Sequence, residues 1–433
     1  MAASATPPLP AEMVEVVVHA MEHRHPHVHL HLVVDMGRRF DHPDLVRALH
    51  GLVEAFPVLG CRYQPGWWRD RWVRWEGDRG ELCHVEETND LEAATRSWVQ
   101  RSIRYLEEPT VRVAFFTAST GGRLVLTLHH MVADGGGIKA AGAVFVSLLC
   151  GVEPNPPPSQ DRSLMSVARS LGVRDIPILL REMLHEGLLP LSSMRVRRLD
   201  YGIPRGSGAP DPHWQPVRLT GDKARHFVAA TTGQGATIND ALVATVARMA
   251  ARRAKQGPVM VAYTVDLRRY LREKRAQVTN LAGVSMVVLG REVTRTTSAS
   301  LRAVSVAIGE QKKRLTGVAY ALLPGFTLGW LPHGLLRWSG QYVISQVLRR
   351  FDRTIAMTNI GALDECLAPL GDDAVEACIV GPFIHGIQVP LITVTGFRGE
   401  LTLNVGATGI HDRQDLANFA CELEGALREL SEG

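Results

Sequence analysis

The sequence predicts an α/β protein built from two units. Short runs rich in valine, leucine and isoleucine, which are typical of strands, alternate along the chain with longer segments of helical apolar spacing. The chain has 433 residues, enough for two domains of ordinary size. Four prolines between positions 154 and 158 indicate a linker. We therefore expect an N-terminal half over residues 1–160, a helical crossover over 161–205 and a C-terminal half over 206–433.

Composition and charge exclude several classes of protein. Apolar residues make up 45% of the chain and charged residues 21%, and the net charge of +4 is too small to indicate a nucleic-acid partner. The six cysteines show no metal-binding spacing, and the first twelve residues lack the apolar core of a secretory signal. We therefore expect free thiols and a cytoplasmic location. No dinucleotide or Walker fingerprint is present, so we expect no tightly bound cofactor.

The N-terminal half alternates predicted strands and helices. Apolar runs predict strands over 14–18 and 28–34, and Asp41 is a suitable N-cap for a helix that reaches Phe56. Four tryptophans then gather in a predicted hairpin, where we expect them to cover an edge of the core, with the lining of an entrance as the alternative: Trp67, Trp68, Trp72 and Trp75. A helix from Asn89 to about Tyr105, a strand over 109–116 and a hairpin at Gly121-Gly122 follow.

Histidines alternate with other residues around the second predicted strand. They are His23, His25, His27, His29 and His31. Period two places them on one face of a strand, where neutral imidazoles could bind a transition metal. We favour a solvated strand face without a metal, because Pro26 interrupts the pattern and no carboxylate or cysteine shares its register.

The central stretch of the chain combines a strand, two histidines and a glycine-rich turn. Leu124–Leu128 is a buried-strand pattern, followed by His129-His130, three residues, Asp134 and three glycines. An imidazole accepts a proton near neutral pH, and glycines let a substrate approach the backbone closely. Two interpretations stay open on residue types alone: a catalytic histidine, or a buried histidine pair at a strand end beside a turn.

The second half repeats the alternation of strands and helices. Residues 162–190 have amphipathic helical spacing, a strand resumes at Val217, and a helix starts near Thr237 and reaches about Arg253. Strands over 258–265 and 284–289, a hairpin over 391–405 and a helix over 412–430 complete the pattern. Residues 315–336 carry no Asp, Glu, Lys or Arg, but prolines and glycines break the segment. We therefore expect a buried helical hairpin rather than a membrane span, with an apolar lid over an acyl chain as the alternative.

The stretch from His129 to Gly135, HHxxxDG, resembles the signature of the acyltransferases related to chloramphenicol acetyltransferase. That superfamily includes the condensation domains of peptide synthetases and the polyketide-associated, wax-ester and plant-type alcohol acyltransferases. The order of elements resembles the family too, and so does the Thr-x-Asn-Asp-Ala-Leu segment at 237–242. The aromatic-Gly-Trp-Gly motif of the plant-type branch is absent. The resemblance implies two similarly folded halves, with mixed sheets flanked by helices and a tunnel at their interface.

The resemblance also assigns roles to individual residues. It implies that His130 is the general base, that Gly135 belongs to the catalytic turn, and that Asp134 pairs with Arg268 in a structural role. Arg269 is the adjacent rival for that pairing. Further positions are expected to line the substrate channel, with Thr358 or a backbone N–H near Gly135 as the donor to an oxyanion: His129, Asn280, Thr358 and Asn359. His129 is expected to pack or hydrogen-bond locally.

The implied reaction is transfer of an acyl group from a thioester to a small-molecule alcohol or amine. The thioester would be an acyl-CoA or a phosphopantetheine thioester, used as co-substrate. The first alternative is a free-standing condensation enzyme whose donor is an acyl carrier protein, docked at the basic residues 195–205 or 268–275. The 195–205 run could instead meet the phosphates of coenzyme A, or be a solvated connector. An inactive binding module of the same fold, and a metal-binding protein using the histidine row, are the remaining alternatives.

Overall fold

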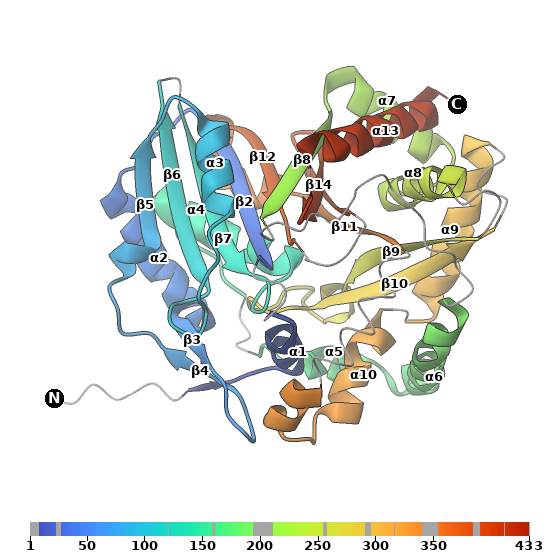
Figure 1. Ribbon diagram of the computed structural model, residues 1–433, viewed down its shortest axis with the longest axis horizontal. Coiled ribbons are helices and arrows are strands. Elements are labelled where there is room, and N and C mark those ends of the chain that lie inside the picture. Colours follow the sequence, from blue (N-terminus) through green and yellow to red (C-terminus); the bar gives the residue numbers. More distant parts are fainter. Residues whose placement is uncertain are drawn as a thin grey trace.

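The computed structural model describes residues 8–22, 27–119, 121–157, 161–193, 211–253, 258–290, 296–315, 317–339, 354–383, 390–410 and 412–432. These residues form two lobes side by side, each with one mixed sheet (Figure 1). The chain is therefore an α/β protein with mixed sheets flanked by helices, as the sequence predicts.

The N-terminal lobe is built on a five-stranded sheet. Its strands, in spatial order, are β12 (Ala374–Val380), β2 (His29–Met36), β7 (Gly121–His129), β6 (Val111–Ala118) and β5 (Cys83–Glu87). Helices α2 (His42–Ala55) and α4 (Gly135–Leu149) cover one face, and α3 (Leu91–Val99) lies on the other. Strand β12 comes from the C-terminal part of the chain and pairs antiparallel with β2. The two lobes therefore share a strand, and the chain order does not separate them completely.

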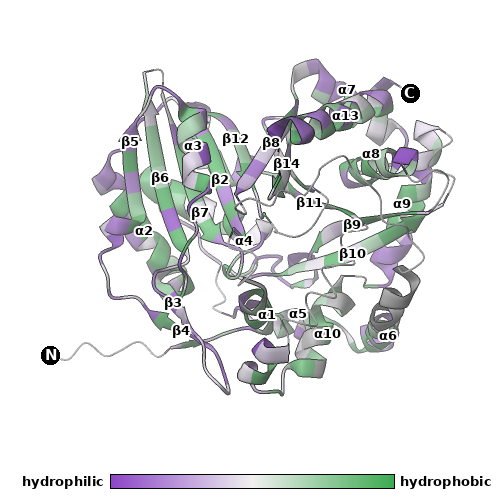
Figure 2. Cartoon of the chain, in the orientation of Figure 1, coloured by the Kyte–Doolittle hydropathy of each residue, from purple (hydrophilic) through white to green (hydrophobic). Residues whose placement is uncertain are grey.

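The C-terminal lobe contains a six-stranded sheet. Its strands, in spatial order, are β10 (Ala282–Leu289), β9 (Val259–Asp266), β11 (Ile355–Ala362), β13 (Leu391–Phe397), β14 (Glu400–Thr408) and β8 (Pro212–Leu219). The helices that pack on it are α7 (Gly221–Gly233), α8 (Ile238–Arg253), α9 (Thr297–Lys313) and α13 (Arg413–Glu432). Each lobe has its own apolar core between sheet and helices, and both sheets are largely hydrophobic in Figure 2.

Smaller elements lie below the two sheets in Figure 1. They are a sheet of β1 (Leu9–Pro10), β4 (Arg71–Arg74) and β3 (Cys61–Gln64), and the helices α1 (Met13–Glu22), α5 (Met165–Ser170), α6 (Ile176–Ser193) and α10 (Val318–Leu328). Single turns of helix complete the described chain: Pro57–Gly60, Arg79–Leu82, Val173–Asp175, Leu267–Tyr270, Asp364–Leu367 and Ala368–Asp373. A further helical segment covers residues 333–339. Within the described residues, no helix is long and apolar enough to cross a bilayer.

Two of the elements expected near the N-terminus are corrected by the structure. The predicted strand over 14–18 is wrong, because these residues belong to helix α1, where the buried Glu15 accepts a hydrogen bond from Trp72 Nε1. The helix expected to reach Tyr105 ends at Val99. Beyond it, the backbone N–H of Ile103 donates to His29 Nε2 and that of Arg104 donates to Glu108. Side chains thus take the N–H groups that a longer helix would need.

The solvated histidine face is also a wrong prediction. His27, His29 and His31 are buried, since α3 and the segment after it cover this face of β2. The His31 ring bonds to Thr127 Oγ1 at 3.0 Å. His23 and His25 lie outside the described residues. In the part of the chain that the structure describes, no group of three or more His, Cys, Asp or Glu side chains is placed to hold a metal ion.

Candidate active site

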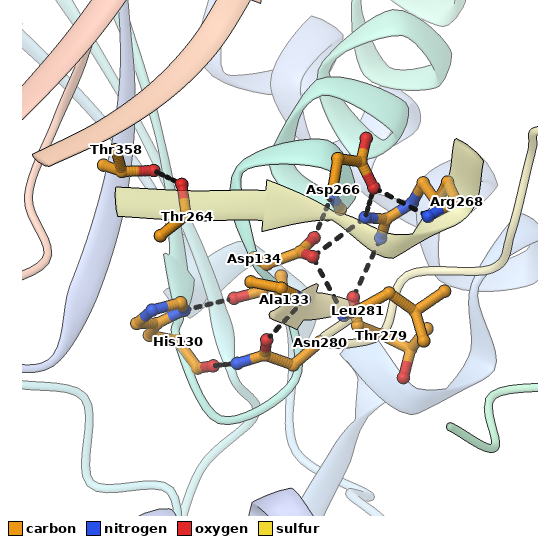
Figure 3. Close-up of polar contacts among 12 residues, drawn as sticks. His130, Ala133, Asp134, Thr264, Asp266, Arg268, Thr279, Asn280, Leu281 and Thr358 are labelled. Carbon is orange, nitrogen blue, oxygen red and sulfur yellow. Dashed lines mark hydrogen bonds and ion pairs between the residues drawn. The ribbon is translucent and has the colours of Figure 1, made fainter. Parts of the chain in front are cut away.

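The predicted HHxxxDG turn connects β7 to α4 where the two lobes meet (Figure 3). Strand β7 lies in the middle of its sheet, and its last residue, His129, pairs with His29 on β2. The backbone then turns: the N–H of His130 donates to Val28 O, and that of Val132 donates to His129 O. Five residues separate the end of β7 from the start of helix α4. A buried strand therefore fixes the position from which His130 leaves the sheet.

The two histidines of the motif have different environments. His129 is fully buried, its ring packs on Tyr105 and His29, and its Nδ1 accepts from the backbone N–H of Met131. His130 is half-buried, and its Nδ1 lies 2.6 Å from Ala133 O. His129 therefore packs within the N-terminal lobe, whereas His130 projects from the turn toward the junction of the lobes (Figure 3).

The contact with Ala133 decides the tautomer of His130. A carbonyl oxygen only accepts hydrogen bonds, so Nδ1 must carry the proton and donate it. In the neutral ring, Nε2 then has the free lone pair. Burial lowers the pKa of His130, against the opposing effects of the Ala133 carbonyl and the Asp134 charge. The ring is therefore neutral at pH 7, with Nε2 as the atom that accepts a proton.

The Asp134 carboxylate accepts three hydrogen bonds, from donors in both lobes. One carboxylate oxygen accepts from Gly137 N at 2.7 Å, which caps α4, and the other accepts from Leu281 N at 2.9 Å and from Arg268 Nη1 at 2.8 Å. Burial alone would raise the pKa of Asp134, but the Arg268 charge and the N–H donors outweigh it and hold the pKa below its ordinary value. The carboxylate is therefore ionised, and its bonds are to backbone and Arg268 rather than to an imidazole.

Arg268 comes from the C-terminal lobe and is almost fully buried. Its Nη1 bonds to Asp134 and to Asp266 Oδ1, and its Nη2 donates to Thr279 O at 3.0 Å. Arg269, the rival position, lies over the Tyr270 ring instead. The expected pairing of Asp134 with Arg268 is thus present, and it joins the first turn of α4 to the end of β9.

The glycines of the turn make room for the C-terminal lobe. A Cβ on Gly136 would lie 2.4 Å from Arg268 Nη1, and one on Gly135 would lie 2.8 Å from Ile360 Cγ1. Ile360 belongs to a bulge in β11, where the register with β13 shifts between Asn359 and Gly361. The three-glycine sequence therefore lets α4 start directly against β11 and Arg268.

Among the remaining predicted site residues, the two asparagines bond to backbone groups, whereas the threonine contacts another side chain. Asn280 Nδ2 donates to His130 O at 3.2 Å, so Asn280 holds the backbone of His130. Asn359 Oδ1 accepts from Gly361 N and thus serves the bulge of β11. Thr358 Oγ1 lies 2.8 Å from Thr264 Oγ1, on the neighbouring strand β9, and in Figure 3 the pair is drawn on the same side of the view as the His130 ring.

Sequence reasoning missed Thr264. The parallel pairing of Met357 with Tyr263 places the next residues, Thr358 and Thr264, side by side. The sequence shows a threonine near the end of an otherwise apolar strand, which could have indicated Thr264. It does not show that Thr358 is the neighbour, because that depends on the order of strands in the sheet.

Two cavities between the lobes, formed by described residues, lie away from His130. One, of about 220 Å³, is lined by Arg96, His213, Trp214, Gln215, Arg413 and Leu416. A smaller one, of about 30 Å³, is lined in part by Asp35, Arg123, Arg218 and Glu376. Arg123 is at the opposite end of β7 from His130, about 20 Å along the strand at ~3.3 Å per residue. Since His130 lines neither cavity, the tunnel stays a prediction. The basic residues 195–205 lie outside the described residues.

Solved structures with the same fold include an acetyltransferase and condensation domains. The chain is similar to TRI3 trichothecene 15-O-acetyltransferase from Fusarium sporotrichioides, with 11% identity, a TM-score of 0.70, and coverage of 98% of this chain and 95% of that one. It is also similar to the first condensation domain of the CDA synthetase, with 16% identity, a TM-score of 0.70 and coverage of 98% and 96%. Polyketide synthase associated protein 5 from Mycobacterium tuberculosis matches with 14% identity, a TM-score of 0.61 and coverage of 97% and 98%.

No family model and no curated protein matches the sequence. The solved structures nevertheless show that the chain has the two-lobed fold of condensation domains and chloramphenicol-acetyltransferase-like acyltransferases, as the HHxxxDG resemblance implies. The fold also includes the epimerization domain of tyrocidine synthetase B, at a TM-score of 0.66 and 16% identity, so the fold alone does not define the reaction.

Proposed function

We propose that this protein is an acyltransferase, with His130 as general base, that moves an acyl group from a thioester to an alcohol or amine. The observation that carries the proposal is the 2.6 Å contact between His130 Nδ1 and Ala133 O. It fixes the tautomer in which Nε2 can accept a proton, on a ring that the motif places at the junction of the lobes.

The proposed reaction needs no covalent acyl-enzyme, because a thioester is already activated. His130 Nε2 removes the proton from the acceptor O–H or N–H as the acceptor oxygen or nitrogen attacks the thioester carbonyl carbon. The tetrahedral intermediate then collapses, the C–S bond breaks, and the proton on His130 goes to the departing thiolate. The Ala133 carbonyl continues to accept from Nδ1 throughout, so the ring keeps its orientation.

Thr358 is the side chain we assign to the developing oxyanion. If Thr264 donates its hydroxyl proton to Thr358 Oγ1, the Thr358 proton is free to point at a negatively charged oxygen. Strands β9 and β11 hold both hydroxyl groups, so the donor is fixed before the substrate binds.

Asp134 has a structural role in this proposal. Its bonds to Arg268, Gly137 N and Leu281 N keep the turn in place against the C-terminal lobe. A proton relay from His130 to Asp134 would require the carboxylate to leave these donors.

The test is to incubate the full chain with acyl-CoA thioesters of several chain lengths and a panel of alcohols and amines. Free thiol is measured as it is released, and mass spectrometry identifies the acylated products. A parallel reaction with acyl carrier protein as donor separates a CoA-dependent acyltransferase from a condensation enzyme. Product formation that is lost in His130→Ala and kept in His50→Ala, a change at an exposed histidine, supports the proposal. No product with any thioester, or full turnover by folded His130→Ala, contradicts it.

A further inference from the structure

Exposed tryptophans gather on one edge of the molecule, which we name the lower edge from its place in Figure 1. The lower edge consists of the turn between β3 and β4, residues 326–339 and helices α5 and α6. Four of its tryptophans are exposed by 63% to 80%: Trp67, Trp68, Trp330 and Trp338. Together they expose on the order of 600 Å², as much as the largest apolar patch on a typical monomer.

The hairpin and the 326–339 segment form one continuous surface. The backbone N–H of Gly334 donates to Trp67 O at 2.8 Å, and that of His333 donates to Trp68 O at 3.2 Å. A Cβ on Gly334 would lie 2.3 Å from the Trp67 ring, so this ring packs directly on the segment between Trp330 and Trp338. Phe326, Leu328 and Leu335 are also exposed here, so the buried hairpin expected over 315–336 is buried only in part.

Helix α6 extends the apolar surface. Leu179 faces the core shared with α10, but Ile176, Leu180 and Leu184 are exposed by 50% to 71%. Their spacing of four residues places them in one stripe along the helix. Val173, in the turn before α6, is 83% exposed. An apolar stripe on a helix normally packs on a protein core, so the exposed stripe of α6 indicates a surface that contacts another apolar partner.

Basic side chains outnumber acidic ones in three described segments of the lower edge. The hairpin residues 64–74, the segment 164–184 and the segment 318–339 contain seven arginines: Arg69, Arg71, Arg74, Arg169, Arg174, Arg181 and Arg337. Their three acids are Asp70 and Glu182, both buried, and Asp175, which is half-buried and caps the turn before α6. The arginines other than Arg337 are exposed. Arg169 pairs with Asp161 and Arg181 with Glu182, and the described segments still carry more exposed positive than negative charge.

We propose that the lower edge is a docking surface for an anionic lipid membrane, on which the protein lies without crossing the bilayer. Tryptophan favours the boundary between lipid headgroups and acyl chains, because its ring is apolar and its N–H is polar. Leucines and phenylalanine enter the outer part of the acyl region, and arginines meet anionic headgroups. The absence of exposed acids in the three described segments favours a lipid surface over an acidic-and-basic protein interface. The inference does not depend on the proposed reaction.

The test is sedimentation of the full chain with vesicles of phosphatidylcholine alone, and with vesicles in which a third of the lipid is phosphatidylglycerol. We expect binding to the anionic vesicles, with a blue shift of tryptophan fluorescence and quenching by brominated acyl chains. Trp68→Ser combined with Trp338→Ser should weaken partitioning about tenfold, and Leu180→Gln with Leu184→Gln should weaken it several-fold. Arg71→Gln with Arg174→Gln should reduce the preference for anionic lipid about tenfold at low salt.

The matched control is Val306→Gln with Val375→Gln, since these valines are exposed by 68% and 66% outside the lower edge. Circular dichroism verifies that each variant is folded. The proposal is overturned if the folded wild type does not bind either vesicle, or if the control loses as much binding as the tryptophan variant. It is also overturned if sedimentation in solution shows a dimer that the tryptophan variant abolishes, with no vesicle binding, because the occupant is then a second copy.

Discussion

Arg268 Nη1 lies 2.8 Å from Asp134 Oδ2, and this pair connects the first turn of α4 in one lobe to the end of β9 in the other. Both side chains are almost fully out of solvent. Asp134 also accepts hydrogen bonds from the backbone N–H groups of Gly137 and Leu281, and Arg268 donates to Thr279 O. These bonds fix the motif turn against the C-terminal lobe. The position of His130 thus depends on residues more than 130 positions later in the chain.

Breaking this pair should destabilise the fold more than it changes the chemistry. Asp134→Asn removes the buried carboxylate and leaves the Arg268 charge with only the exposed Asp266 as an acidic partner. We expect a loss of about 3–5 kcal/mol in the free energy of unfolding. The measurement is urea denaturation. The double variant Asp134→Asn with Arg268→Gln should cost less free energy of unfolding than the sum of the single changes, because it removes both charges of the pair. Additive losses would show that the two side chains do not interact.

His130→Ala should lower kcat about 10²- to 10⁴-fold while leaving the midpoint of urea denaturation near that of the wild type. The reason is that the ring is half-buried and bonds only to the nearby Ala133 carbonyl among described groups. Since burial lowers the pKa of His130, kcat/KM in the wild type should rise with pH through an apparent pKa below 6.5. If His130→Ala loses activity but kcat/KM of the wild type does not fall at low pH, His130 does not act as a base that titrates in this range.

Thr358→Val should lower kcat about 10²- to 10³-fold if its hydroxyl donates to the oxyanion. Thr264→Val should have a smaller effect, since in the proposed arrangement Thr264 only orients the Thr358 hydroxyl, 2.8 Å away. KM for the thioester should change little in both variants. Equal and small losses in both would assign the threonine pair to packing between β9 and β11.

Gly136→Ala should destabilise the protein and reduce activity, because the new Cβ would lie 2.4 Å from Arg268 Nη1. The matched control is Gly309→Ala in α9, where nothing lies within 4 Å of an added Cβ. That change should be neutral or stabilise the helix by about 0.5–1 kcal/mol. Thermal unfolding of both variants provides the comparison, and an equal response would exclude close packing as the reason for the glycine.

The buried histidines should make the fold sensitive to acid. Burial, with a smaller effect of Arg112, lowers the pKa of His31 to about 3, and burial lowers the pKa of His29 well below its ordinary value. Because the unfolded chain binds these protons near pH 6.5 and the folded chain does not, stability is complete above that pH and falls as pH drops toward 3. Urea denaturation at pH 7.5 and 5.0 should show a loss of roughly 2 kcal/mol from His31 and a further loss from His29.

His31→Gln should reduce that pH dependence, whereas His50→Gln, at an exposed position, should leave it unchanged. The Gln variant also has to accommodate the contact with Thr127 Oγ1, so the slope against pH is compared rather than the absolute stability. If the free energy of unfolding depends on pH in His31→Gln as it does in the wild type, residues other than His31 cause the acid sensitivity.

The sequence by itself determined the fold class, the strand that carries the motif and the helices that Asp41 and the 237–240 segment begin, because these depend on local spacing and capping. It did not determine that helix α1 replaces a strand or that β12 joins the N-terminal sheet, since distant segments decide both. The burial of the histidine row was missed for the same reason: period two identifies a face, but only packing shows which face is covered. Likewise, the motif named His130 as the candidate base, but only the tertiary structure placed the Ala133 carbonyl at Nδ1 and Thr358 beside Thr264. The first contact depends on the backbone path of the turn. The second depends on the pairing of β9 with β11, which brings together threonines 94 positions apart. The spacing of residues along the chain specifies neither.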